Sequence, residues 1–202
     1  MIRPFAWILF LLSPATAAGE NYFFFMADRL EFVAEPEHGL WDVQGWYGGD
    51  EHKFWWKSEG DFDSNGIEEA DVQLLYSGAV SAFWDLQLGL RQSIEPSPSS
   101  TYAVIGFQGL APQWFEVDVA AFVSDDGDLS ARFEAEYDLR LTQRLVLQPR
   151  VEFETGPDSV SLDLRLRYEI RREIAPYFGV SWQDRNGEEA FVSFVAGARF
   201  WF

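Results

Sequence analysis

The segment "FEAEYDLRLTQRLVLQPRVEFET" (residues 133–155) alternates apolar and polar side chains along most of its length, and many of the polar ones are charged. Successive side chains of a β-strand point to opposite faces, so this alternation predicts strands with one apolar and one charged face. A helix would mix the two kinds around its circumference. The segment therefore predicts two strands joined by "RLTQ" (140–143), with an apolar face that needs a large covering surface.

The same alternation recurs along nearly all of the chain after residue 20. It predicts twelve strands, an even number, near residues 28–33, 40–47, 54–60, 69–76, 84–91, 101–109, 115–123, 129–139, 144–154, 160–170, 176–182 and 191–202. Most are longer than the roughly 5–6 residues of a globular strand and match the length of a tilted strand that crosses a bilayer. We therefore expect an all-β fold, a transmembrane antiparallel up-and-down β-barrel of about 12 strands. A soluble β-sandwich is the alternative.

The connections between these strands fall into two sets that alternate along the chain. One set is acidic and rich in turn residues: "AEPEHG", "GDFDSNGIEE", "IEPSPSS", "SDDGD", "ETGPDS" and "QDRNGEE". The other set is shorter on average and less acidic: "GGDEHK", "SGAVSA", "LAPQ", "RLTQ" and "RREIA". Such an alternation of acidic and less acidic connections is expected of an up-and-down barrel, because its successive turns lie at opposite ends. We assign the acidic set to the external side and the other to the periplasm.

The first twenty residues have the layout of a secretory signal. A single positive charge at Arg3 precedes an apolar stretch, a proline and the small residues Ala15-Thr16-Ala17-Ala18. The apolar stretch is too short to span a bilayer. We expect a signal peptide over residues 1–18, cleavage after Ala17 or Ala18, and a barrel over residues 19–202.

Composition narrows the classes of function. The chain has no cysteine, so it has neither disulfides nor a thiolate metal site. Its net charge of −18 disfavours nucleic acid and anionic membrane surfaces as partners.

The C-terminal sequence "FVAGARFWF" is the most specific single feature. It ends an alternating apolar strand on an aromatic residue, and Gly197, Phe200 and Phe202 resemble the signal that the bacterial outer-membrane assembly machinery recognises. The alternative is a buried terminal strand that ends in phenylalanine by chance. We expect an outer-membrane location, with outer-membrane lipid and the assembly machinery as partners.

Several long blocks resemble the copper resistance protein B family of bacterial outer membranes: "GGDEHKFWWKSEG" (48–60), "FWDLQLGLRQ" (83–92), "GFQGLAPQWFEVD" (106–118), "FEAEYDLRLTQRLVLQPRVE" (133–152) and "LRLRYEIRREIAPYFGVSW" (166–182). The resemblance implies an outer-membrane β-barrel that takes part in copper resistance or homeostasis and binds or passes copper ions, alongside periplasmic copper-handling proteins. Members of that family often carry a Met- and His-rich segment ahead of the barrel, which suits copper. Here only Met26, His38 and His52 follow the expected signal, so capture of copper by such a segment is not carried over.

The turn "GGDEHK" offers one candidate metal site. The His52 imidazole directly follows two hard carboxylate ligands, Asp50 and Glu51, and could hold a divalent ion weakly with them, while Met26 could be a soft contact for Cu(I). The alternatives are a solvated turn and a methionine that packs in the barrel wall. His38 is expected at the opposite end of the barrel.

A second candidate is a set of carboxylates on the inner face of the predicted barrel: Glu69, Asp71, Glu116, Asp118, Glu134, Glu136 and Asp138. They could form an electronegative path for cations. They could instead pair with arginines of neighbouring strands (Arg132, Arg150, Arg165 and Arg167) and fill a narrow interior. The two interpretations are compatible if some carboxylates stay unpaired.

Catalysis has little support in the sequence. The two histidines lie in separate turns, and the chain has no nucleophile motif such as G-x-S-x-G, so we do not expect an enzyme. The expected function is copper resistance at the outer membrane. The alternative is a narrow outer-membrane cation channel without copper specificity, or a structural barrel.

Overall fold

The computed structural model describes residues 21–156, 158–187 and 189–202, so the predicted signal peptide lies outside the described residues. The described chain is almost entirely β-structure. The strands are β1 (Tyr22–Val33), β2 (His38–Gly48), β3 (His52–Asp63), β4 (Gly66–Ala79), β5 (Trp84–Glu95), β6 (Ser100–Ala111), β7 (Phe115–Ser124), β8 (Leu129–Glu136), β9 (Leu139–Arg140), β10 (Leu145–Glu154), β11 (Ser159–Tyr168), β12 (Ile174–Arg185) and β13 (Phe191–Trp201). A short 3₁₀ turn, η1 (Pro112–Trp114), joins β6 to β7.

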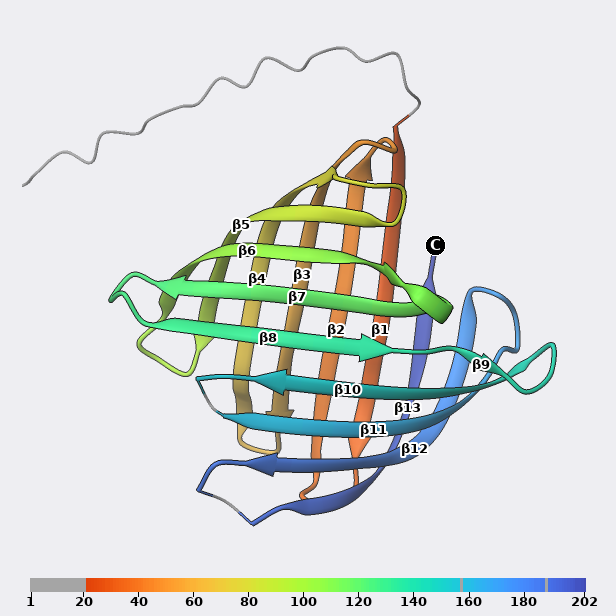
Figure 1. Ribbon diagram of the computed structural model, residues 1–202. Helices are drawn as coiled ribbons and strands as arrows, with labels where there is room; N and C mark the ends of the chain where they lie inside the picture. Colours follow the sequence, from red (N-terminus) through yellow and green to blue (C-terminus); the bar gives the residue numbers. More distant parts are fainter. Residues whose placement is uncertain (1–20, 157, 188) are drawn as a thin grey trace, which may run out of the picture.

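The strands form one closed antiparallel barrel. Neighbours in sequence pair with each other from β1 to β8 and from β9 to β13, β8 also pairs with β10, and β13 returns to pair with β1, which closes the barrel. β8 and β9 both pair with β10 and together make one wall strand, interrupted at Tyr137 and Asp138. The barrel therefore has twelve spans, which confirms the predicted fold. In Figure 1, β1–β4 lie behind and β7, β8 and β10 lie in front, so two walls face each other across the interior.

Some strand bounds differ from those predicted. β1 begins at Tyr22, six residues before the predicted start, because the aromatic run after Tyr22 pairs with β2 although it lacks alternation. β11 ends at Tyr168 because Ile170 already belongs to the turn that leads to β12.

The outward face of the barrel is apolar. Alternate residues of the strands expose large hydrophobic side chains, such as Leu74 and Tyr76 on β4 and Val192 and Phe194 on β13. The side chains that alternate with these, such as Leu75 and Ser77 on β4 and Ser193 on β13, are buried. An exposed apolar band around a closed barrel is stable in lipid and not in water. The described residues include no helix long and apolar enough to cross a membrane.

The two ends of the barrel differ in character. The acidic-loop end carries the connections that include residues 34–37, 64–65, 96–99 and 125–128. The short-turn end carries residues 49–51, 80–83, 141–144 and 169–173 together with η1. These two names are used below.

A β-bulge in β1 changes which charges face the interior. Ala27 pairs with Val43 and Arg29 with Asp42, so Asp28 is the extra residue on β1. A bulge shifts the alternation by one position, which turns two consecutive side chains inward. Asp28 then pairs with Arg199, with 2.8 Å between the Arg199 Nε and Asp28 Oδ1 atoms, while Arg29 pairs with Asp42 at 3.2 Å.

Part of the interior is apolar. Leu75, Val104 and Phe122 form a buried cluster between β4, β6 and β7, and Trp55 and Tyr102 pack against it. The Arg91 guanidinium lies 4.9 Å from the centre of the Phe122 ring, a distance at which a cation–π contact is favourable. This cluster fills one side of the barrel, so the remaining free space is narrower than the outline of the strands.

Gly197 is held against the wall where the barrel closes. A Cβ atom at this position would lie 2.6 Å from both the Leu30 carbonyl oxygen and the Tyr177 hydroxyl. We expect Gly197→Ala to lower the free energy of unfolding by about 1–3 kcal/mol, because these neighbours belong to packed strands and cannot retreat without strain. Urea unfolding of the refolded barrel in detergent measures the change.

Gly78 provides the matched control. It is also a strand glycine, but its nearest neighbour to an added Cβ is the His52 Nδ1 atom at 3.9 Å, an ordinary contact. Gly78→Ala should unfold at the same urea midpoint as the wild type. Equal urea midpoints for the two variants would contradict the close fit at Gly197.

Candidate functional site

Two cavities lie end to end in the interior that the described strands enclose. One, of about 370 Å³, extends from the middle of the barrel toward the short-turn end; the other, of about 430 Å³, extends toward the acidic-loop end. Of the described residues, only Glu59 on β3 and Arg132 on β8 line both cavities. The contact between these two side chains therefore forms part of the partition between the cavities.

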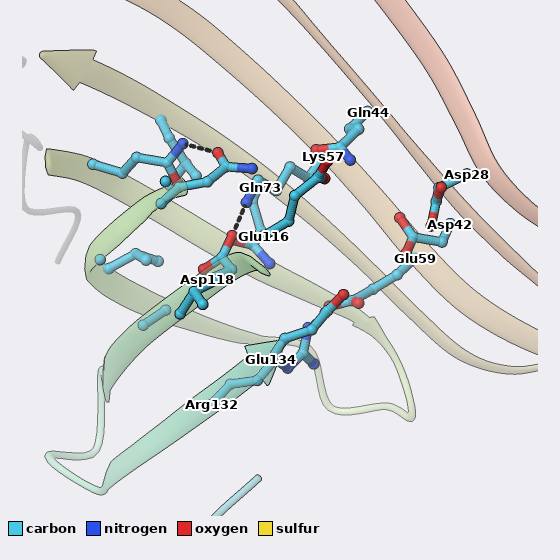
Figure 2. A pocket seen from close by; sticks show the side chains of 18 of the residues that line it. Asp28, Asp42, Gln44, Lys57, Glu59, Gln73, Glu116, Asp118, Arg132 and Glu134 are labelled. Atoms are coloured by element: carbon cyan, nitrogen blue, oxygen red, sulfur yellow. Dashed lines mark hydrogen bonds and ion pairs between the residues drawn. The ribbon is translucent and has the colours of Figure 1, made fainter. Parts of the chain in front are cut away.

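The short-turn cavity has a large excess of acid. Its lining includes one lysine, Lys57, and one arginine, Arg132, against seven carboxylates: Asp28, Asp42, Glu59, Glu116, Asp118, Glu134 and Glu136. Figure 2 shows that Asp28, Asp42 and Glu59 come from one wall while Glu134 comes from the facing wall. Within the described chain, Glu116 and Glu136 form no ion pair, although Glu136 accepts a hydrogen bond of 3.0 Å from the Gln148 amide.

The acidic-loop cavity shows the same imbalance. Four arginines line it (Arg29, Arg132, Arg165 and Arg185), against nine carboxylates: Glu31, Glu59, Asp61, Glu68, Glu69, Glu152, Glu154, Asp163 and Asp184. Asp61 and Glu69 are direct cross-strand partners on β3 and β4, and neither forms an ion pair with another described residue. Like charges placed opposite one another in a sheet are destabilising, so a cation that lies between them would be favoured.

Arg132 joins the two walls between the cavities. Its NH1 group donates to Glu59 on β3, across the interior, and its NH2 group lies 3.2 Å from the Glu154 Oε2 atom on neighbouring β10. Its Nε atom is 3.8 Å from Glu152 Oε1. One guanidinium thus contacts three carboxylates from two walls, and the side chain is largely shielded from solvent.

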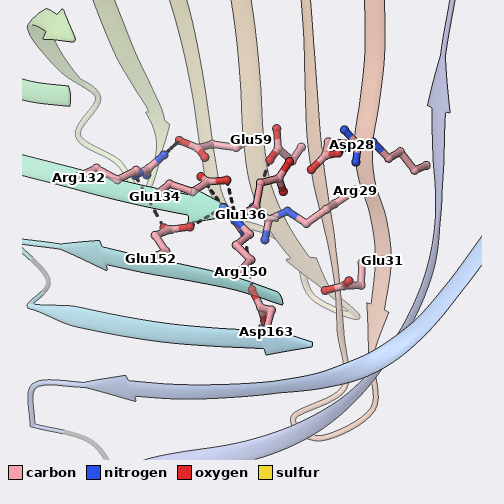
Figure 3. Close-up of polar contacts among 12 residues, drawn as sticks. Asp28, Arg29, Glu31, Glu59, Arg132, Glu134, Glu136, Arg150, Glu152 and Asp163 are labelled. Atoms are coloured by element: carbon pink, nitrogen blue, oxygen red, sulfur yellow. Dashed lines mark hydrogen bonds and ion pairs between the residues drawn. The ribbon is translucent and has the colours of Figure 1, made fainter. Parts of the chain in front are cut away.

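A continuous network of ion pairs extends from this contact through the middle of the barrel, as Figure 3 shows in part. Arg150 contacts Glu134 through two bonds of 2.7 Å and Glu152 through one of 2.6 Å. Asp163 lies between Arg150 and Arg165 and pairs with both, and Arg165 also pairs with Glu31. Arg91 pairs with Asp71 and with Glu154. We call these residues, with Arg132 and Glu59, the ion-pair belt. Charges this buried are tolerated only when paired.

The structure places the seven carboxylates predicted for the interior at different points of this arrangement. Glu116, Asp118, Glu134 and Glu136 gather in the short-turn cavity, whereas Glu69 lines the other cavity. Asp71 pairs with Arg91 and Asp138 with Arg167. Several pairs cross the interior rather than joining neighbouring strands, including Lys57–Asp118 at 2.7 Å and Arg132–Glu59.

Sequence patterns did not identify Glu59, Asp28 or Arg29 as interior residues. Glu59 lies in a β3 segment where aromatic and polar residues fall on both faces, and the bulge in β1 breaks the alternation at Asp28. Pairing across the interior depends on which walls face each other, and a period-2 pattern carries no such information.

The structure does not bring Met26 together with the other candidate metal ligands, Asp50, Glu51 and His52. The His52 Nδ1 atom lies 2.8 Å from the Tyr76 hydroxyl on the exposed side of the wall, whereas Met26 lines the short-turn cavity, and its sulfur accepts a hydrogen bond from Arg199. Asp50 and Glu51 are exposed in the turn before β3. No group of three or more His, Asp or Glu side chains in the described chain is arranged to hold a metal ion. His38 starts β2 at the acidic-loop end, opposite His52.

The three residues of the predicted assembly signal lie on β13 and just after it. Gly197 pairs with Glu31 on β1, and Phe200 pairs with Ala27. The Phe202 side chain is exposed, and the Phe202 N–H donates a hydrogen bond of 2.9 Å to the Phe25 carbonyl. The signal thus lies at the β1–β13 closure of the barrel.

Comparisons with known proteins agree with this architecture. A family model described as "Copper resistance protein B precursor (CopB)" matches residues 21–202. The chain is 44% identical to "Copper resistance protein B" of Escherichia coli, over 88% of this chain and 68% of that protein. It is 37% identical to "Copper resistance protein B homolog" of Pseudomonas syringae pv. tomato, over 89% of this chain and 69% of that protein.

Solved structures share the fold at low sequence identity. The NanC porin matches with a TM-score of 0.58 at 12% identity, over 89% of this chain and 99% of its own. The KdgM porin in complex with disordered oligogalacturonate matches with a TM-score of 0.55 at 9% identity, over 89% and 98%. Outer membrane phospholipase A from Escherichia coli also matches, with a TM-score of 0.53 at 12% identity, over 89% and 91%. Porins and an enzyme share this fold, so the fold alone does not decide between transport and catalysis.

Proposed function

This chain belongs to the copper resistance protein B family, and we propose that it contributes to copper resistance by attracting copper ions into its acidic interior and passing them across the outer membrane. The location follows from the closed barrel with an apolar outer band. The observation that supports passage is the excess of carboxylates in both cavities, which lie in series along the barrel. Acidic walls of low dielectric concentrate cations.

The unpaired carboxylates mark the proposed route. Asp61, Glu68 and Glu69 line the acidic-loop cavity, and Glu116 and Glu136 line the short-turn cavity. Carboxylate oxygens are hard ligands that hold copper less firmly than imidazole or thioether groups. Conduction requires sites that attract an ion and also release it, so weak oxygen sites suit passage better than tight capture.

The ion-pair belt separates these two groups of carboxylates. A copper ion would pass it by replacing the guanidinium of Arg132 on Glu59, Glu152 or Glu154 for the time of the transfer. Copper is the cargo in this proposal and is bound only weakly. At the short-turn end, which we assign to the periplasm, copper-handling proteins would be the partners.

Growth on copper tests the proposal. Deletion of the gene should lower copper tolerance, and wild-type protein should restore it. The double variant Glu116→Gln/Glu136→Gln should restore it only in part, because the short-turn cavity loses its two carboxylates that lack an ion pair. Growth is compared over a copper series at matched expression.

The control variant Asp125→Asn/Asp126→Asn removes two carboxylates from an exposed turn instead. It should restore tolerance better than the cavity variant. Unchanged tolerance after deletion would refute a role in copper resistance and favour a cation channel without copper specificity or a structural barrel. Equal tolerance of the two variants would refute passage by way of Glu116 and Glu136.

A further inference from the structure

The short-turn end carries a basic pocket in an otherwise acidic protein. This pocket, of about 600 Å³, is lined by Arg140, Thr142, Gln143, Arg144, Glu169, Ile170, Arg171 and Arg172. Two connections build it, residues 141–144 and 169–173, and Figure 1 shows both turns at the same end of the barrel. The Glu169 N–H donates a hydrogen bond of 2.7 Å to the Arg144 carbonyl, which holds the two turns together.

Three of the four arginines of this pocket have no carboxylate partner among the described residues. Among the lysines and arginines of the described chain, only Arg144, Arg171, Arg172 and Arg185 form no ion pair, and three of these four line this one pocket. The fourth arginine of the pocket, Arg140, forms a long ion pair of 3.7 Å with Glu169, and its side chain is largely exposed. Carboxylates outnumber basic residues 33 to 15 in the sequence, so three unpaired arginines in one pocket are a marked local excess.

The surroundings of the pocket are apolar on the membrane side. Leu139, Leu141 and Ile170 are exposed next to the arginines, where the outer band of the barrel ends. An anionic group at this level would meet guanidinium groups, while an acyl chain attached to it would lie against these side chains. Guanidinium groups bind phosphate oxygens with paired hydrogen bonds.

We propose that this pocket binds the phosphate group of an anionic phospholipid of the adjoining membrane leaflet. Arg144, Arg171 and Arg172 contact the phosphate, and Leu141 and Ile170 contact the acyl chains. The barrel is thereby anchored at a fixed depth by its short-turn end. The site is separate from the interior cavities and does not depend on copper.

Native mass spectrometry of the barrel in neutral detergent tests the proposal. The barrel is titrated with phosphatidylglycerol or with phosphatidylcholine of the same acyl chains. Each of the three arginines should contribute about fivefold, so wild-type protein should retain phosphatidylglycerol about 100-fold more strongly, and this preference should fall about fivefold for each arginine replaced by glutamine. The test variants are Arg144→Gln and the double variant Arg144→Gln/Arg171→Gln.

Arg185→Gln is the matched control, because Arg185 is also exposed and pairs with no described carboxylate but lies at the acidic-loop end. It should retain the wild-type preference. Equal retention of the two lipids by wild type, or an equal loss in Arg185→Gln, would overturn the proposal. A competition arm with inorganic phosphate distinguishes the source: displacement of the lipid by millimolar phosphate would assign the pocket to free phosphate instead.

Discussion

Arg132→Ala is expected to open the barrel to ions. Among the residues that the structure describes, Arg132 and Glu59 alone line both cavities, and their contact spans the interior between β8 and β3. Truncation to alanine removes the side chain that separates the cavities and leaves Glu59, Glu152 and Glu154 facing the opened space. We expect cation conductance in planar bilayers to rise by on the order of tenfold, because the narrowest point of a pore dominates its resistance.

Two further variants show whether the bridge itself is responsible. Arg132→Lys keeps the positive charge and part of the reach, so its conductance should stay near that of wild type. Arg185→Ala removes an arginine that lines the acidic-loop cavity but forms no ion pair with another described residue. It should change conductance far less than Arg132→Ala. Equal conductance of Arg132→Ala and wild type, with both barrels folded, would refute the partition.

Arg150→Ala is expected to destabilise the barrel more than any other single change proposed for the ion-pair belt. Arg150 is buried on β10 and contacts Glu134, Glu152 and Asp163. Removing one partner of a buried ion pair leaves uncompensated charge and costs about 3–5 kcal/mol. Here carboxylates from three strands would lose a shared cation, so the urea midpoint of unfolding should fall accordingly.

Arg140→Ala is the control for that loss. The Arg140 side chain is 62% exposed and lies 3.7 Å from Glu169, so its removal should change the free energy of unfolding by less than about 1 kcal/mol. If Arg150→Ala does not fold, Arg150→Lys should fold with a smaller decrease in urea midpoint. Unfolding of both Arg150 variants at the wild-type midpoint would contradict the structural role of the network.

Local pattern was sufficient to predict the barrel. The alternation around residues 133–155 predicted strands, and their number and length predicted spans of a membrane barrel. The structure has twelve spans in the predicted order, since neighbours in sequence pair with each other and β13 pairs with β1. Strand alternation is a property of adjacent residues, so it can be recognised without knowledge of the partners.

Other features depend on contacts between distant residues. Phe122 and Leu75 form an apolar cluster inside a barrel whose interior was expected to be charged, and the bulge at Asp28 turns Arg29 inward as well. The basic pocket likewise requires two turns that hold Arg144 and Arg171 close together. None of these follows from period-2 alternation.

The sequence by itself determined that this protein is a barrel with an apolar outer face and a charged inner face, because apolar and polar residues alternate along most of the strands. Only the tertiary structure decided which charges meet. Arg132 and Glu59 are 73 residues apart and come from facing walls. Closure of the barrel sets which walls face each other and how far apart they are, and this geometry turns an acidic interior into two cavities separated by a belt of ion pairs.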